Sequence, residues 1–107
     1  MTMPFTSTLR ARRDTIRLGT PNGEALTLRV ELPELWDVVR IVAPPAERVL
    51  AIKVAALAAL DPRADARDFV IKINGREVLD ERRSVSQVGA RDGSIFLLTH
   101  RRRRPVR

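Results

Sequence analysis

One stretch of the chain constrains its fold more than any other. Residues 47–60 form the only long segment that lacks Gly and Pro and consists of residues that favour a helix. Pro44 and Pro45 precede it and Asp61-Pro62 follows it, and proline is not accepted in a helix interior. We therefore predict a helix over residues 47–60. Since every other regular pattern in the chain is that of a strand, we expect this helix to pack on a sheet.

Alternation of apolar and polar residues predicts the strands of that sheet. In residues 26–32 every second side chain is apolar, which is the pattern of a half-buried strand. The connection through residues 33–35 is short, so we expect the first two strands to form an antiparallel hairpin. The full set of strands is expected at residues 26–32, 37–43, 69–73, 77–79 and 94–100.

Shorter signals fill the connections between these elements. Asn74-Gly75 and Asp92-Gly93 predict tight turns. Residues 84–90 are compatible with a short helical turn. Residues 15–18 are expected to pair with the strand at 26–32 across the turn at residues 20–23, as an extra edge hairpin.

Charge divides the chain into three parts. Residues 1–24 hold four Arg and two acidic residues, residues 25–100 are neutral, and residues 101–107 hold five Arg without an acidic residue. We expect a basic N-terminal arm over 1–24, a single domain over 25–100 and a disordered Arg-rich tail over 101–107. No apolar run is long enough to span a membrane, no signal-peptide core is seen near the N-terminus, and Cys is absent. These features predict a cytoplasmic protein.

The order of the predicted elements resembles that of a known family. Hairpin, helix, strand, Asn-Gly turn, short strand and final strand follow one another as in the β-grasp fold of ubiquitin-like proteins. Residues 39–45, 69–75 and 84–98 are similar to the second strand with its proline-bearing exit, the third strand with its turn, and the closing segment of that family. The resemblance implies an α+β, ubiquitin-like β-grasp domain with a mixed sheet of four to five strands packed on one helix. In its first hairpin the chain is similar to small bacterial ubiquitin-like proteins of type VII secretion loci.

The resemblance also implies roles for particular residues. The family docks partners on the open face of its sheet, and the matching positions are Val70, Lys72, Leu97 and Thr99, so that a charge stands at the centre of the patch. Lys53 matches a largely buried lysine of the family, and Asp80 matches its carboxylate partner. Modifiers of the family end in Gly-Gly, whereas this chain has no Gly beyond Gly93. Conjugation by the usual chemistry is therefore disfavoured.

The helix carries a second apolar stripe with two interpretations. Leu50, Val54 and Leu57 lie about 100° around the helix from the core-facing residues Val49 and Ile52. The stripe is either covered by a widened sheet or by the arm, through Phe5, Leu9 or Leu18, or it is a docking surface for a protein partner or a homodimer seam.

The remaining candidate residues favour binding over catalysis. His100 is the only His, and with no Cys it predicts neither a metal site nor a triad. Trp36, at the hairpin turn, is interpreted either as a plug at the edge of the core or as an interface anchor. The tail is suited to contact with an acidic partner, an acidic membrane or a nucleic acid through Arg101, Arg102, Arg103 and Arg104. It has no aromatic residues on which bases could stack, so sequence-specific recognition of a nucleic acid is not supported.

We therefore predict a non-enzymatic protein-interaction module, acting as an adaptor or as an accessory subunit of a bacterial secretion system. It is expected to need no cofactor, metal or small-molecule substrate. Two alternatives stay open. One is a ubiquitin-like modifier with an atypical or processed C-terminus, and the other is a basic nucleic-acid accessory protein that binds weakly through the Arg tail.

Overall fold

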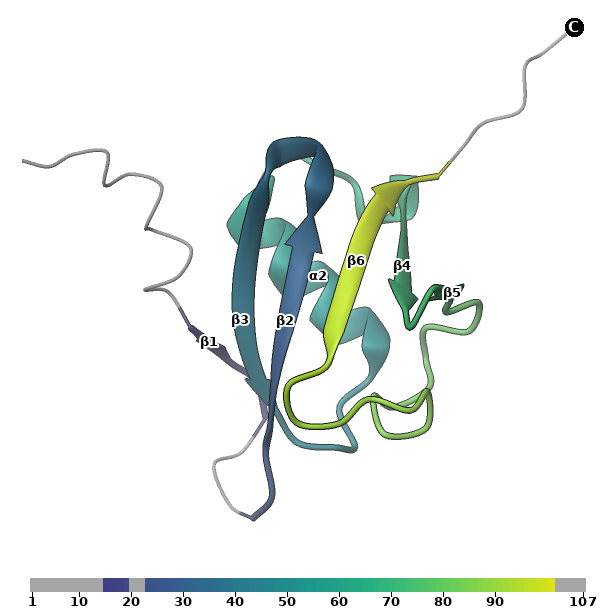
Figure 1. Cartoon of the computed structure of the whole chain (residues 1–107). Coiled ribbons are helices and arrows are strands. Elements are labelled where there is room, and N and C mark those ends of the chain that lie inside the picture. Colours follow the sequence, from purple (N-terminus) through teal and green to yellow (C-terminus); the bar gives the residue numbers. More distant parts are fainter. Residues whose placement is uncertain (1–14, 20–22, 102–107) are drawn as a thin grey trace, which may run out of the picture.

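The computed structural model describes residues 15–19 and 23–101, and the predictions on Phe5, Leu9 and the tail beyond Arg101 lie outside this part of the chain. Figure 1 shows one helix lying across one face of a sheet. The elements, in chain order, are β1 (Ile16–Arg17), β2 (Leu26–Leu32), a 3-10 turn (Pro33–Leu35), β3 (Asp37–Ala43), α2 (Val49–Leu60), a second 3-10 turn (Ala66–Asp68), β4 (Phe69–Ile73), β5 (Arg76–Glu77) and β6 (Ile95–His100).

The sheet has six strands in the order β1-β3-β2-β6-β4-β5. Strands β2 and β3 form the predicted antiparallel hairpin, with Val30 opposite Val39. Strand β6 then runs parallel to β2 and antiparallel to β4, which makes the sheet mixed. The predicted α+β architecture is confirmed, with one strand more than expected because the segment before β2 also joins the sheet.

That extra strand, β1, does not pair as predicted. It lies parallel to β3, with Ile16 opposite Ile41, rather than forming a hairpin with β2. The reason is that β2 already has β3 on one side and β6 on the other, so β3 offers the free edge. A hydrogen bond of 2.8 Å from the Leu18 amide to the Val42 carbonyl extends the pairing, and Gly19 then turns the chain with a φ of +77°.

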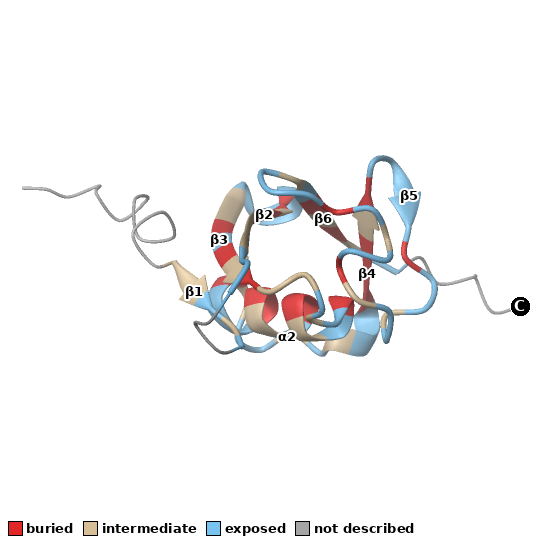
Figure 2. Ribbon diagram, turned by 90° about the horizontal axis from the view of Figure 1, so that it is seen from below, coloured by how far each residue is buried: buried red, intermediate tan, exposed pale blue. Residues whose placement is uncertain are grey.

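The core lies between α2 and the sheet, and Figure 2 shows that the buried side of the helix faces the strands. Val49, Ile52, Ala56 and Leu60 are buried there, as predicted. Leu57 is also buried, with 3% of its surface exposed, so its assignment to an outer stripe is wrong. The buried face is wider than the predicted stripe because Lys53 and Leu57, four residues apart, also point inward.

The first turn of α2 is closed by a distant loop rather than by a capping side chain. Arg48 stands at the N-cap and makes no side-chain capping bond. Instead the amides of Val49 and Leu50 donate to the carbonyl oxygens of Arg83 and Glu81, at 2.9 and 2.8 Å. These two bonds satisfy helix amides that would otherwise lack partners, and they fasten the loop of residues 79–83 to the start of the helix.

The docking of β1 gives the first testable prediction. A Cβ at Gly19 would lie 2.8 Å from the Pro44 ring, whereas one at Gly23, which also has positive φ, meets nothing within 4 Å. Gly19→Ala should therefore detach β1, and Gly23→Ala should impose only the backbone strain. Amide hydrogen exchange at Leu18 should lose its protection in the first variant and keep it in the second. Equal protection in both would show that the Pro44 contact does not hold β1.

Candidate partner-binding surfaces

The structure brings together the four residues predicted on the open face of the sheet. Lys72 lies opposite Leu97, and Val70 lies opposite Thr99, on the adjacent strands β4 and β6. Charged residues flank this group, because Leu97 is also opposite Glu31 and Lys72 is also opposite Glu77. The centre of the face is therefore a single leucine within a row of alternating charges.

Val70 contributes less to this face than the strand alternation predicts. It is buried, with 8% of its surface exposed, although its neighbours Lys72 and Thr99 are partly exposed. We name the depression that it lines the open-face depression, which has a volume of about 530 Å³. Its lining residues are Glu34, Val70, Lys72, Glu77, Thr99, His100 and Arg101.

The turn between β2 and β3 carries the most exposed large apolar side chain that the structure describes. Trp36 is 94% exposed, so its interpretation as a plug at the edge of the core is wrong. Its backbone is left-handed, with a φ of 53°, because it ends the 3-10 turn that begins at Pro33. Leu35, next to it, is half-exposed. We name Leu35 and Trp36 the hairpin tip.

His100 has a structural role that the sequence did not indicate. Its ring stacks on Phe69 with the ring centroids 4.3 Å apart, and its Nδ1 lies 2.7 Å from Glu34 Oε1. The pair joins the hairpin turn to the end of β6. No local pattern predicts it, because Glu34 and His100 are 66 residues apart and meet only once β2 and β6 are neighbours.

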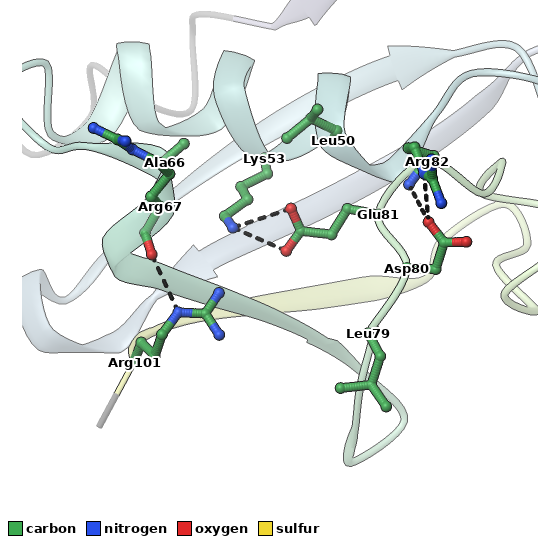
Figure 3. Close-up of a pocket in the computed structure, with 9 residues that line it drawn as sticks. All are labelled: Leu50, Lys53, Ala66, Arg67, Leu79, Asp80, Glu81, Arg82 and Arg101. Atoms are coloured by element: carbon green, nitrogen blue, oxygen red, sulfur yellow. Dashed lines mark hydrogen bonds and ion pairs between the residues drawn. The ribbon is translucent and has the colours of Figure 1, made fainter. Parts of the chain in front are cut away.

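A second hollow lies between the helix and the loop that caps it. We name it the Leu79 groove, with a volume of about 640 Å³. Figure 3 shows Lys53 reaching from the helix toward Glu81, with Leu50 on the helix and Leu79 further along the loop. Its lining residues are Leu50, Lys53, Ala66, Arg67, Leu79, Asp80, Glu81, Arg82 and Arg101.

An ion pair different from the expected one stands in this groove. Lys53 is 2% exposed, and its amine contacts both carboxylate oxygens of Glu81, at 3.1 and 2.9 Å. The expected partner, Asp80, instead binds Arg82 at 3.1 Å. The reason is that the Glu81 carbonyl accepts the Leu50 amide, which places Glu81 beside the first turn of the helix.

The exposed acids near the groove are held by their own arginines. The hydrogen bond from the Arg82 guanidinium lowers the pKa of Asp80 below its ordinary value. The hydrogen bond from Arg67 lowers the pKa of Asp65 in the same way. In each pair the acid and the arginine are two positions apart and exposed. Their charges neutralise each other locally, and the pair contributes little to the free energy of folding.

The helix stripe is only partly a surface. Leu50 and Val54, one turn apart on α2, are exposed, as the docking interpretation requires and the covered one does not, whereas Leu57 belongs to the core. Leu79, which lines the same groove as Leu50, is an exposed apolar side chain that sequence reasoning missed. Leu79 directly follows the buried Val78, and only the fold shows that the Leu79 side chain is not buried with it.

Two further findings concern the described residues 15–19 and 23–101. No three of their His, Asp or Glu side chains converge on a point where a metal ion could be held. No helix among them is long and apolar enough to cross a bilayer.

The Lys53–Glu81 pair gives a second prediction. Glu81→Gln leaves a buried ammonium without its counter-charge and should lower the free energy of unfolding by about 3 kcal/mol. The double change Lys53→Met with Glu81→Gln should stay within about 1 kcal/mol of the wild type, because the stem still packs and no charge is stranded. Asp80→Asn is the matched control and should leave the unfolding midpoint in urea unchanged. A larger loss in Asp80→Asn than in Glu81→Gln would contradict the assigned pairing.

Comparison with known proteins identifies similar folds but no similar sequences. No family model matches the chain, and no curated protein matches it in sequence. The ubiquitin-like domain of an Arabidopsis thaliana protein superposes with a TM-score of 0.64 at 12% identity, covering 82% of this chain and 89% of that one.

Ubiquitin from Caldiarchaeum subterraneum gives a TM-score of 0.63 at 15% identity, covering 74% of this chain and 96% of that one. The N-terminal ubiquitin-like domain of a further protein gives 0.59 at 18% identity, covering 84% and 93%. At such identities the structural similarity establishes the fold alone. The chain therefore has the ubiquitin-like β-grasp fold that the order of its elements predicts.

Proposed function

We propose that the chain is a non-enzymatic protein-interaction module that works as an adaptor or accessory subunit, and that it binds its partner through the hairpin tip and the open-face depression. The observation that carries the proposal is Trp36. The side chain is 94% exposed on a backbone with a φ of 53°. Both features are unfavourable for the isolated domain.

The left-handed backbone of Trp36 carries a free-energy cost of known order. A left-handed conformation costs a residue with a Cβ about 1–2 kcal/mol, and glycine or asparagine relieves it. A largely solvated indole returns almost no burial energy to offset that cost. Trp36 therefore does not serve the stability of the fold. Tryptophan is enriched among the residues that dominate binding at protein interfaces, which favours a role for Trp36 as an anchor.

The surroundings of the tip suggest what the partner presents. Glu34, one residue before the tip, is bonded to His100, which lines the open-face depression together with Lys72 and Thr99. The tip and the depression are thus continuous through the Glu34–His100 pair. A fitting partner offers an apolar pocket for the indole and polar groups for the charged row around Lys72. Such an arrangement has an apolar centre and a polar rim.

The wider setting is also a proposal. The first hairpin resembles small ubiquitin-like proteins of type VII secretion loci, and we propose that the partner is a cytoplasmic component of such a bacterial system. A modifier role is the alternative outcome. It predicts a ladder of covalent high-mass species on a denaturing gel, which a C-terminal fusion would abolish.

A third prediction separates binding from stability at Trp36. Trp36→Gly should raise the free energy of unfolding by about 1 kcal/mol, because glycine relieves the left-handed strain. The same change should weaken partner binding roughly 30-fold or more, the effect of losing a strong interface anchor. Trp36→Ala keeps the strain and should weaken binding without the gain in stability.

The partner is found by placing a photo-crosslinking amino acid at Leu35 in cells that encode the chain, with Gln87 as the matched exposed control position. We expect one discrete adduct from position 35 that disappears in Trp36→Gly. An adduct that persists in Trp36→Gly, or one that forms equally from position 87, would contradict the proposed surface. A covalent ladder without irradiation would instead support the modifier.

A further inference from the structure

We propose that the Leu79 groove is a second binding site, and that it takes a short acidic peptide segment with apolar side chains from a partner protein. The inference extends the proposed function, since an adaptor needs more than one surface, but it rests on different residues. The hairpin tip takes no part in it.

Apolar side chains at the groove are the first line of support. Leu79 is 85% exposed, and Leu50, which lines the same groove from the helix, is 40% exposed. Val54, one helical turn beyond Leu50, continues the apolar strip along α2. These side chains gain little from the fold in their present positions, whereas a segment laid along the groove would remove them from water.

Charge is the second line of support, and it selects an acidic occupant. Four cationic side chains line the groove, and three of them are paired with carboxylates, including Arg67, which is bonded to Asp65 at 2.9 Å. The carboxylate of Glu81 is taken by Lys53, and that of Asp80 by Arg82. The Arg101 guanidinium, by contrast, donates to two neutral carbonyl oxygens, those of Arg67 and Phe69, at 3.1 and 3.3 Å. These bonds orient the guanidinium without cancelling its charge.

The sequence beyond Arg101 adds to the same charge. Four further arginines, Arg102, Arg103, Arg104 and Arg107, follow within six residues and no acidic residue lies among them. A basic stretch that continues from a lining residue raises the local concentration of an acidic segment and speeds its encounter with the groove. The tail therefore supports recognition without having to provide its specificity.

The groove is held open by backbone bonds rather than by side chains alone. The loop of residues 79–83 is fastened to the helix through the Glu81 and Arg83 carbonyls, and the Arg101 amide donates to the Asp68 carbonyl at 2.8 Å. Figure 3 shows Lys53 and Glu81 paired between these two walls. A site whose walls are already fixed loses little conformational entropy when it is filled.

Two other polyanions fit the groove less well. The lining residues include no aromatic ring on which a nucleic-acid base would stack. A lipid surface would meet a convex, apolar element, whereas this site is hollow and its apolar residues lie beside ion pairs. Both remain as outcomes that the experiment must distinguish.

The test uses the full chain and fluorescently labelled peptides of equal length. One peptide alternates Glu with Leu, one contains Glu without Leu, and one alternates Lys with Leu. Fluorescence anisotropy should show binding of the first at low salt, weaker binding of the second and none of the third. Leu79→Ser should weaken the first peptide about tenfold, since it removes one buried leucine. Leu35→Ser is the matched control on the hairpin tip and should leave binding unchanged.

Deleting residues 102–107 separates the groove from the tail. The truncated chain should still prefer the Glu-Leu peptide over the Glu peptide, with weaker binding and a shallower dependence on salt. If binding vanishes on truncation while Leu79→Ser has no effect, the tail alone binds acids and the groove proposal is wrong. Tighter binding to a single-stranded oligonucleotide or to anionic vesicles than to the Glu-Leu peptide, unaffected by Leu79→Ser, would also overturn it.

The two proposals can fail independently. Amide chemical shifts on adding the Glu-Leu peptide should change at Leu50, Lys53 and Leu79. Changes confined to Lys72 and Thr99 would contradict the groove while leaving the open face in place as a binding surface. Conversely, the absence of a crosslink from position 35 would contradict the proposed function, and it would leave the evidence from peptide binding in the groove intact.

Discussion

The packing of α2 on the sheet depends on a contact that is remote in sequence. The helix begins where the carbonyl oxygens of Glu81 and Arg83 accept its first two free amides, and Glu81 also holds the buried amine of Lys53. One loop thus completes the start of the helix and compensates a charge inside the core. The same loop carries Leu79 to the surface and forms one wall of the groove. Fold and candidate site therefore share these interactions.

The strand order determines where the other surface lies. Because β6 lies between β2 and β4, its last residue, His100, comes beside the β2–β3 turn and bonds to Glu34. The same pairing sets Leu97 between Glu31 and Lys72 on the open face. An exposed indole at one end of this face and a charged row along it make a surface that is neither uniformly apolar nor uniformly charged. This mixed character suits a specific protein partner better than non-specific adhesion.

Much of the fold could be predicted because its signals are local. Alternation located β2 and β3, freedom from Gly and Pro located α2, and Asn74-Gly75 located the turn into β5. What local signals could not supply was which elements are neighbours. From the sequence, Trp36 fits either a plug at the core edge or an interface anchor, and only the structure shows that its side chain is exposed at the turn. Whether Leu57 of the second stripe is covered or exposed could not be predicted, because the width of the buried helix face depends on what packs against it. The choice of Glu81 over Asp80 follows from a backbone bond that no spacing indicates.

The fold is complete without Trp36, whose exposed side chain we propose is left for a partner. Because Trp36 is the only tryptophan, collisional quenching of its fluorescence by iodide tests this claim directly. The account predicts that the quenching constant of the native protein is close to that of the protein unfolded in urea, with emission at the wavelength of a solvated indole in both. Strong protection from iodide in the native monomer, lost on unfolding, would show that the indole is part of the core and would contradict the account.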